Sequence, residues 1–215
     1  MFLQRRKIIL ASRSPARRQI LIEAGLKLDV KFPDIDESRL LREPVSRYAV
    51  RVAHEKARKI AEEYSCHPRR ECGDPASPLD SRLRGNDFPV VIGVDTIIAL
   101  GNKIFGKPSN REEAKKFLRA LSGRWHKVYS GTVVIDTIRN KTIKKLVVSK
   151  VRFTKLSEDM IDWYVSTGEP LRVAGAYAIQ WKGMALIEAV NGCFTNVIGI
   201  SIPVLMGMLK KLKAV

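Results

Sequence analysis

The chain has 215 residues and a net charge of +17, from 39 Lys and Arg residues against 22 Asp and Glu residues. Its length suits one domain, and 45% hydrophobic with 28% charged residues is typical of a globular protein. No apolar stretch approaches the roughly 20 residues that cross a bilayer, which argues against a membrane protein. The three cysteines are too few for a disulfide framework, so we expect a reducing, cytoplasmic environment.

The first elements are a strand and a helix joined by a short polar turn. The apolar run at residues 8–10 predicts the strand, and Ser14 followed by Pro15 predicts a helix N-cap and first helical position. Arg17 and Arg18 then fall in the first helical turn, where the helix dipole favours anions. A bound phosphate would balance these two cations. The alternative is that both arginines lie on a solvated face of a basic protein.

Strands and helices alternate along the rest of the chain. Ser109 to Glu112 has the spacing of a capping box, which predicts a helix that opens there and runs to about residue 121. The remaining predicted elements are strands at 28–32, 90–100, 128–138, 143–153 and about 185–190, and helices at 44–64, 157–167 and about 203–212. This alternation predicts a three-layer or two-lobed α/β protein with a mixed sheet.

Residues 66–87 depart from this pattern, with three prolines, two glycines and no apolar periodicity. We expect a surface loop or a disordered insertion. Residues 80–87 resemble the translated product of a dispersed bacterial repeat element, which would give the insertion a mutational origin. One alternative reading of the chain is therefore an enzyme damaged by this insertion.

Asp95 is the strongest catalytic candidate on chemical grounds. It interrupts the apolar run at 90–100, where a carboxylate is costly unless it is paired, metal-bound or at a strand end. Such a group can take a proton from water or bind a divalent cation. The alternative is an aspartate that caps a turn. Glu37, in the acidic segment 34–38, is the natural second metal carboxylate, with a solvated acidic loop as its alternative.

Further polar residues are candidates for substrate contacts. Lys56 and Lys107 can pair with phosphate oxygens, although most lysines simply lie on the surface. The amide of Gln180 offers both a donor and an acceptor for the edge of a base. Ser12, Ser14 and His126 are residue types used in nucleophilic catalysis, but no nucleophile elbow surrounds either serine, so we expect no hydrolytic triad.

Taken together, these segments resemble the Maf (septum formation protein) family of nucleoside triphosphate pyrophosphatases. The order of so many separate motifs makes the resemblance specific, and it covers nearly the whole chain apart from the insertion. The matching segments are 10–21 (LASRSPARRQIL), 34–38 (DIDES), 54–57 (HEKA), 91–100 (VIGVDTIIAL), 104–131, 166–180 (STGEPLRVAGAYAIQ) and 191–205.

The resemblance implies a two-lobed α/β, Maf/inosine-triphosphatase-like fold, with a mixed twisted sheet flanked by helices and a central cleft. One such domain would span residues 1–215, with 66–87 inserted in it. The implied activity is hydrolysis of a nucleoside triphosphate to the monophosphate and pyrophosphate, with a divalent cation (Mg, Mn or Co) as cofactor. A homodimer is also implied, whereas the cytoplasmic location and the absence of a membrane partner are expected from the composition.

The resemblance also assigns roles to individual residues. Asp95 would be the proton acceptor or a metal ligand, and Glu37 would complete the metal site. The phosphate-binding residues would be Ser12, Arg17, Lys56 and Lys107, and the residues associated with base selection would be Thr96 and Gln180. The form of the segment that ends at Gln180 resembles the branch of the family that prefers dTTP and UTP.

The chain departs from the family pattern at two informative positions. Ala16 stands where an arginine often follows Ser-Pro, and that arginine is linked to base preference. Trp181 stands where glycine usually follows the glutamine.

A rival reading is a non-catalytic basic protein that binds nucleic acid or regulates cell division, suggested by the net charge. The basic residues are scattered, however, and are not interleaved with aromatic residues that stack on bases. This distribution favours the enzyme over a nucleic-acid partner.

Overall fold

The structure is a computed structural model that describes residues 4–64 and 88–215. The predicted insertion at 66–87 lies outside these residues. The strands are β1 (Ile8–Ala11), β2 (Asp29–Lys31), β3 (Val90–Leu100), β4 (Lys103–Phe105), β5 (Trp125–Asp136), β6 (Lys141–Phe153) and β7 (Ile187–Asn191). The α-helices are α1 (Pro15–Glu23), α2 (Val45–Ala61), α3 (Arg111–Leu121), α4 (Glu158–Ser166), α5 (Phe194–Ile198) and α6 (Ile202–Lys211). Short 3₁₀ helices are η1 (Glu62–Tyr64), η2 (Glu169–Arg172), η3 (Ala174–Ala176) and η4 (Lys182–Leu186).

All seven strands belong to one mixed sheet in the order β2-β1-β3-β5-β6-β7, with β4 paired to β3 outside this path. Strand β1 runs parallel to both β2 and β3, whereas the remaining pairs are antiparallel. The predicted α/β class with a mixed sheet is therefore confirmed.

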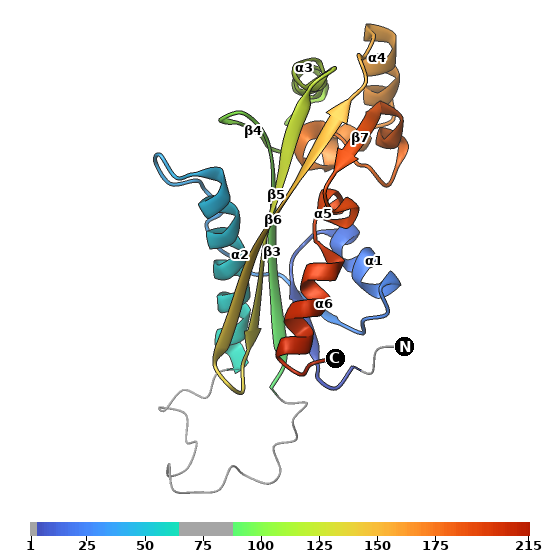
Figure 1. The fold of residues 1–215 in the computed structure, drawn as a ribbon. Coiled ribbons are helices and arrows are strands. Elements are labelled where there is room, and N and C mark those ends of the chain that lie inside the picture. The colour runs from blue at the N-terminus through green and yellow to red at the C-terminus, as the bar shows by residue number, and fades with distance from the viewer. Residues whose placement is uncertain (1–3, 65–87) are drawn as a thin grey trace, which may run out of the picture.

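Helices cover both faces of the sheet at the end that carries β1 (Figure 1). Helix α2 lies on one face, and α1, α5 and α6 lie on the other. Because successive side chains of a strand point to opposite faces, β3 contributes to two cores. Val91 packs with Ala53 and Ala57 of α2, whereas Ile92 packs with Leu209 of α6.

A second lobe surrounds the opposite ends of the long strands β3, β5 and β6. It holds β4, α3, α4, β7 and the 3₁₀ helices η2 to η4 (Figure 1). Its core gathers large side chains, among them Phe105, Leu118, Phe153 and Tyr164. The three long strands run through both lobes, so the two-lobed interpretation is confirmed.

Two glycines let α2 lie directly on the sheet. A Cβ atom at Gly93 of β3 would come within 2.1 Å of the carbonyl oxygen of Ala53. A Cβ atom at Gly131 of β5 would come within 2.2 Å of the carbonyl oxygen of Ala49. Any side chain at either position would therefore push the helix away from the strands.

The structure corrects several local predictions. The N-cap of α3 is Asn110 rather than Ser109, because the Asn110 side chain accepts from the Glu113 N–H at 2.9 Å. Glu113, not Glu112, reaches back to the Ser109 N–H at 2.7 Å. The short helix α5 was not predicted, since its five residues are too few to show a periodicity. In the described parts of the chain, no helix is both long and apolar enough to cross a membrane.

Candidate active site

The candidate site lies at a gap along one edge of β3. Strand β1 pairs with this edge as far as Gly93, and β4 pairs with it again from Ile98 onward. Within the described residues, no strand pairs with this edge at residues 94–97. Asp95 and Thr96 lie in this gap, and strand alternation sends their side chains to opposite faces of the sheet.

On the α2 face, Asp95 joins a cluster of three charged side chains. The Lys56 Nζ lies 3.0 Å from Oδ1 of Asp95 and 2.7 Å from Oε2 of Glu37. The Lys56 side chain is 8% exposed and that of Asp95 14%, whereas Glu37 is 54% exposed. The predicted trio is thus brought together, with its lysine buried and one carboxylate open to solvent.

Helix α2 also holds the loop that carries Glu37. The Tyr48 hydroxyl donates to the Glu37 carbonyl at 2.6 Å, and Arg51 donates to the Ser38 carbonyl at 2.8 Å. Burial raises the pKa of the Tyr48 phenol, and the negative charges of Asp95 and Glu37 add to this effect. Sequence reasoning missed Tyr48, since a tyrosine on the apolar stripe of a helix resembles an ordinary core residue.

On the opposite face, Arg17 is buried and forms four side-chain hydrogen bonds. Its Nε donates to the Gly199 carbonyl at 3.0 Å, and Nη1 donates to Ser12 Oγ at 3.0 Å and to the Val94 carbonyl at 3.1 Å. Its Nη2 donates to Thr96 Oγ1 at 2.9 Å. Burial lowers the pKa of Arg17, and the negative charges of Asp95 and Glu37 oppose this shift.

This bonding limits what Arg17 can offer a phosphate. A guanidinium has five N–H donors, and four are used, so one N–H on Nη2 is left. The phosphate-binding role of Arg17 stays a prediction. Neighbouring Arg13 and Arg18 are exposed, and neither guanidinium has an ion-pair partner in the described chain. Both line a pocket of about 450 Å³ with Ser12 and Ser14.

Thr96 is the centre of a polar network behind the gap. Its hydroxyl accepts from Arg17, donates to the Gly199 carbonyl at 2.9 Å and lies 3.0 Å from the hydroxyl of Ser130. Sequence reasoning did not assign Gly199 or Ser130 to the site. A serine within an apolar strand carries no signal of such a role.

The other two predicted contact residues lie on neighbouring loops. Lys107 is exposed on the loop between β4 and α3, and Gln180 is half-buried after η3. The Gly175 N–H donates to the Gly106 carbonyl at 2.9 Å, which joins these two loops. Neither side chain has a hydrogen-bond partner among the residues described, so both are available to a ligand.

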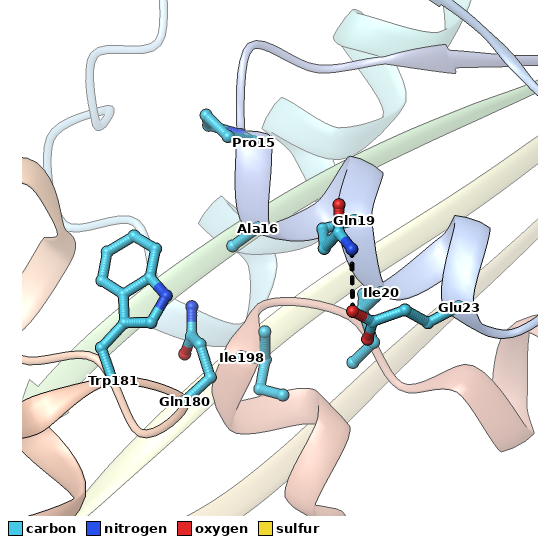
Figure 2. A pocket seen from close by; sticks show the side chains of 8 residues that line it. All are labelled: Pro15, Ala16, Gln19, Ile20, Glu23, Gln180, Trp181 and Ile198. Atoms are coloured by element: carbon cyan, nitrogen blue, oxygen red, sulfur yellow. Dashed lines mark hydrogen bonds between the residues drawn. The ribbon is translucent and has the colours of Figure 1, made fainter.

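Gln180 lines a pocket of about 400 Å³ beside helix α1 (Figure 2). Its lining side chains come from α1, from the loop after η3 and from the end of α5: Pro15, Ala16, Gln19, Ile20, Glu23, Gln180, Trp181 and Ile198. Gly199, next to Ile198, accepts from Arg17 and Thr96, so this pocket adjoins the polar network of the gap.

The donor set fits a divalent cation of the magnesium type. Magnesium is bound through one or two carboxylates together with substrate phosphates and water. Asp95 and Glu37 both reach the same ammonium, so a cation at this point would find two carboxylates within reach. No group of three His, Cys, Asp or Glu side chains suited to a metal occurs in residues 4–64 and 88–215. The cluster therefore suits a cation held jointly with phosphate.

Comparisons with known proteins identify the family of this chain. The family model described as Maf-like protein matches residues 7–212. A protein of Clostridium botulinum strain Okra, named dTTP/UTP pyrophosphatase, is 36% identical over 96% of this chain and 97% of its own length. Proteins with the same name from Anaeromyxobacter dehalogenans and Acetivibrio thermocellus are 38% and 36% identical, over 95% of this chain and 93% and 94% of theirs. The chain belongs to the family of Maf-like proteins.

Proposed function

We propose that this protein is a nucleoside triphosphate pyrophosphatase that hydrolyses dTTP and UTP to the monophosphate and pyrophosphate. The observation that carries the proposal is the convergence of Glu37, Asp95 and Lys56 at the gap in the sheet. The names of the relatives support the reaction and the two substrates. We also propose that the enzyme acts as a homodimer, as the family resemblance implies, and in the cytoplasm, as the composition indicates.

Asp95 and Glu37 would hold a divalent cation such as Mg²⁺, Mn²⁺ or Co²⁺. When bound, such an ion withdraws charge from phosphate oxygens and lowers the pKa of water. The chain adds positive charge of its own, since Lys56 lies between the two carboxylates. Lys107, which has no ion-pair partner in the described structure, follows two residues after Phe105, the β4 residue that pairs with Ile98 of β3.

The reaction is the attack of water on the α-phosphorus. A bond forms between the water oxygen and phosphorus, the bond from phosphorus to the bridging oxygen breaks, and pyrophosphate leaves. Lys56 holds one oxygen of each carboxylate, and Asp95 is the more buried of the two, so Asp95 is assigned to take the proton of the water. Lys56 and Lys107 stabilise the charge that develops on the phosphate oxygens.

We assign selection of the base to residues on the face of the sheet opposite helix α2. Gln180 presents an amide that can donate to a carbonyl of uracil or thymine and accept from its ring N–H. The Thr96 hydroxyl is already engaged by Arg17 and Gly199, so it acts by fixing the shape of the site.

Purified protein with Mg²⁺ or Mn²⁺ and a panel of triphosphates tests the proposal. We expect release of pyrophosphate, not orthophosphate, from dTTP and UTP. Asp95→Asn should lower turnover by about 10²–10⁴-fold, because the proton acceptor is lost. Asp29→Asn is the matched control, since Asp29 is 61% exposed, pairs with Lys7 and lies on β2, which β1 separates from β3. No release from either nucleotide, or wild-type turnover in Asp95→Asn, would refute the proposal.

The nucleic-acid-binding alternative makes a separate prediction. It requires steeply salt-dependent binding of DNA or RNA that survives the loss of Asp95. Filter binding across a salt series with the Asp95→Asn protein would show this directly.

A further inference from the structure

We propose that Trp181 binds the nucleobase that Gln180 selects, by stacking its indole on the base in the pocket beside α1. This inference rests on the proposed function and adds a binding residue that the family pattern does not supply. Figure 2 shows Trp181 and Gln180 on one wall of the pocket and Ala16 on the facing helix α1. At about 400 Å³, the pocket falls within the range of small-molecule sites.

The charged side chains that line the two pockets beside α1 indicate which pocket suits the base and which suits phosphate. Among the described residues that line this pocket, Glu23 is the one with a charged side chain, and it accepts a hydrogen bond from Gln19 at 2.8 Å. A carboxylate repels phosphate but tolerates a neutral base. Arg13 and Arg18, which have no ion-pair partner within residues 4–64 and 88–215, line the other pocket beside α1 instead. The two pockets share Pro15 and Gln19, so they lie on adjoining sides of the N-terminal half of α1.

The polar and apolar parts of the lining suit a pyrimidine. Ala16, Ile20 and Ile198 supply apolar contacts for the faces and rim of a ring. The Gln180 side chain points toward α1 and has no partner in the described chain, so its donor and acceptor remain for the base edge (Figure 2).

Trp181 is placed to cover one face of that ring. Its side chain is 40% exposed although it lines a pocket, which leaves part of the indole open to a ligand. Stacking on an indole is favourable for every base, because every base has an aromatic face. Trp181 therefore supplies affinity that is independent of base identity, while Gln180 reads the edge.

Ala16 keeps the facing wall small. A long side chain at this position would extend from α1 into the space opposite Trp181 (Figure 2). Ala16 and Trp181 both depart from the family pattern, and both line this one pocket. Compared with the family pattern, this chain lacks the frequent arginine at position 16 of α1 and has an aromatic side chain at position 181 of the loop.

Equilibrium binding of thymidine 5′-monophosphate and uridine 5′-monophosphate tests this inference without turnover. Trp181→Ala should weaken both by about tenfold to hundredfold, whereas Trp181→Phe should retain most of the affinity. Deoxyribose 5-phosphate, which lacks a base, should bind wild type and Trp181→Ala equally. Trp163→Ala is the matched control, since Trp163 is 46% exposed on α4.

Fluorescence gives a second readout in a protein whose Trp125 and Trp163 are replaced by Phe. Its remaining indole should be quenched by thymidine 5′-monophosphate and unchanged by deoxyribose 5-phosphate. Equal nucleotide affinity in a folded Trp181→Ala protein, with no quenching, would overturn this inference while leaving hydrolysis of dTTP and UTP intact. Absence of both nucleotide binding and hydrolysis in the wild type would overturn the proposed function as well.

Discussion

Replacing Gly93 by alanine should displace helix α2 from the sheet and so lower the activity of the candidate active site, because α2 carries Lys56. The new Cβ would lie 2.1 Å from the Ala53 carbonyl oxygen and 2.7 Å from the Ala57 nitrogen, where ordinary contact begins at 3.4 Å. The helix must therefore retreat by about 1.3 Å, because both atoms belong to its backbone and cannot rotate away. We place the cost at the upper end of overpacking, about 3 kcal/mol.

For a chain of this size, that cost corresponds to a fall in Tm of about 6–12 °C. Lys56 moves with the helix and leaves Asp95, and a misplacement of about 1 Å reduces turnover by about 100-fold. Differential scanning calorimetry and a pyrophosphate-release assay measure the two effects. Gly207→Ala on α6 is the control, since its Cβ meets nothing within 4 Å, and it should raise stability by about 0.5–1 kcal/mol. Wild-type Tm and turnover in Gly93→Ala would refute this reasoning.

Two further predictions concern charge. Lys56→Met should lower kcat/KM by about 100-fold, because a charge that stabilises the phosphate is lost. It should also increase the rise in Tm that Mn²⁺ causes, because Asp95 and Glu37 then face each other without a counter-charge; an unchanged Mn²⁺ response would contradict this. Burial lowers the pKa of His126 from 6.5 to about 4, so the unfolded chain binds a proton that the folded chain excludes between these values. The free energy of unfolding should therefore fall as pH decreases from 6.5 to 4, by up to about 1.4 kcal/mol per pH unit. In His126→Phe, the free energy of unfolding measured with urea should depend less on pH over this range.

Much of the fold could be predicted because local signals agree with the tertiary structure. Ser14 caps α1 and accepts from the Arg17 N–H at 3.3 Å, as the Ser-Pro pair predicts. Strand β3 has the predicted bounds, since a run of apolar residues without helical spacing suits a strand covered on both faces.

The charges of the site were harder to place from sequence. The pairing of Lys56 with Asp95 depends on the approach of α2 to Gly93, which no local pattern encodes. The burial of Arg17 depends on Gly199, whose carbonyl comes from the far end of the chain. The family resemblance therefore indicated which residues belong to the site, but it did not indicate which of their N–H donors are already bonded within the protein.

The three long strands that join the lobes have a mechanical consequence. Strand β5 is hydrogen-bonded to β3 on one side and to β6 on the other along both lobes, so the three strands form one stiff unit next to the gap. A motion that brings the two lobes closer would require all three strands to bend together, and this bending would strain the backbone hydrogen bonds between them. The width of the gap is therefore set by the sheet itself. Adjustment to different nucleotides is left to the side chains and loops around its rim, among them the loop that carries Trp181.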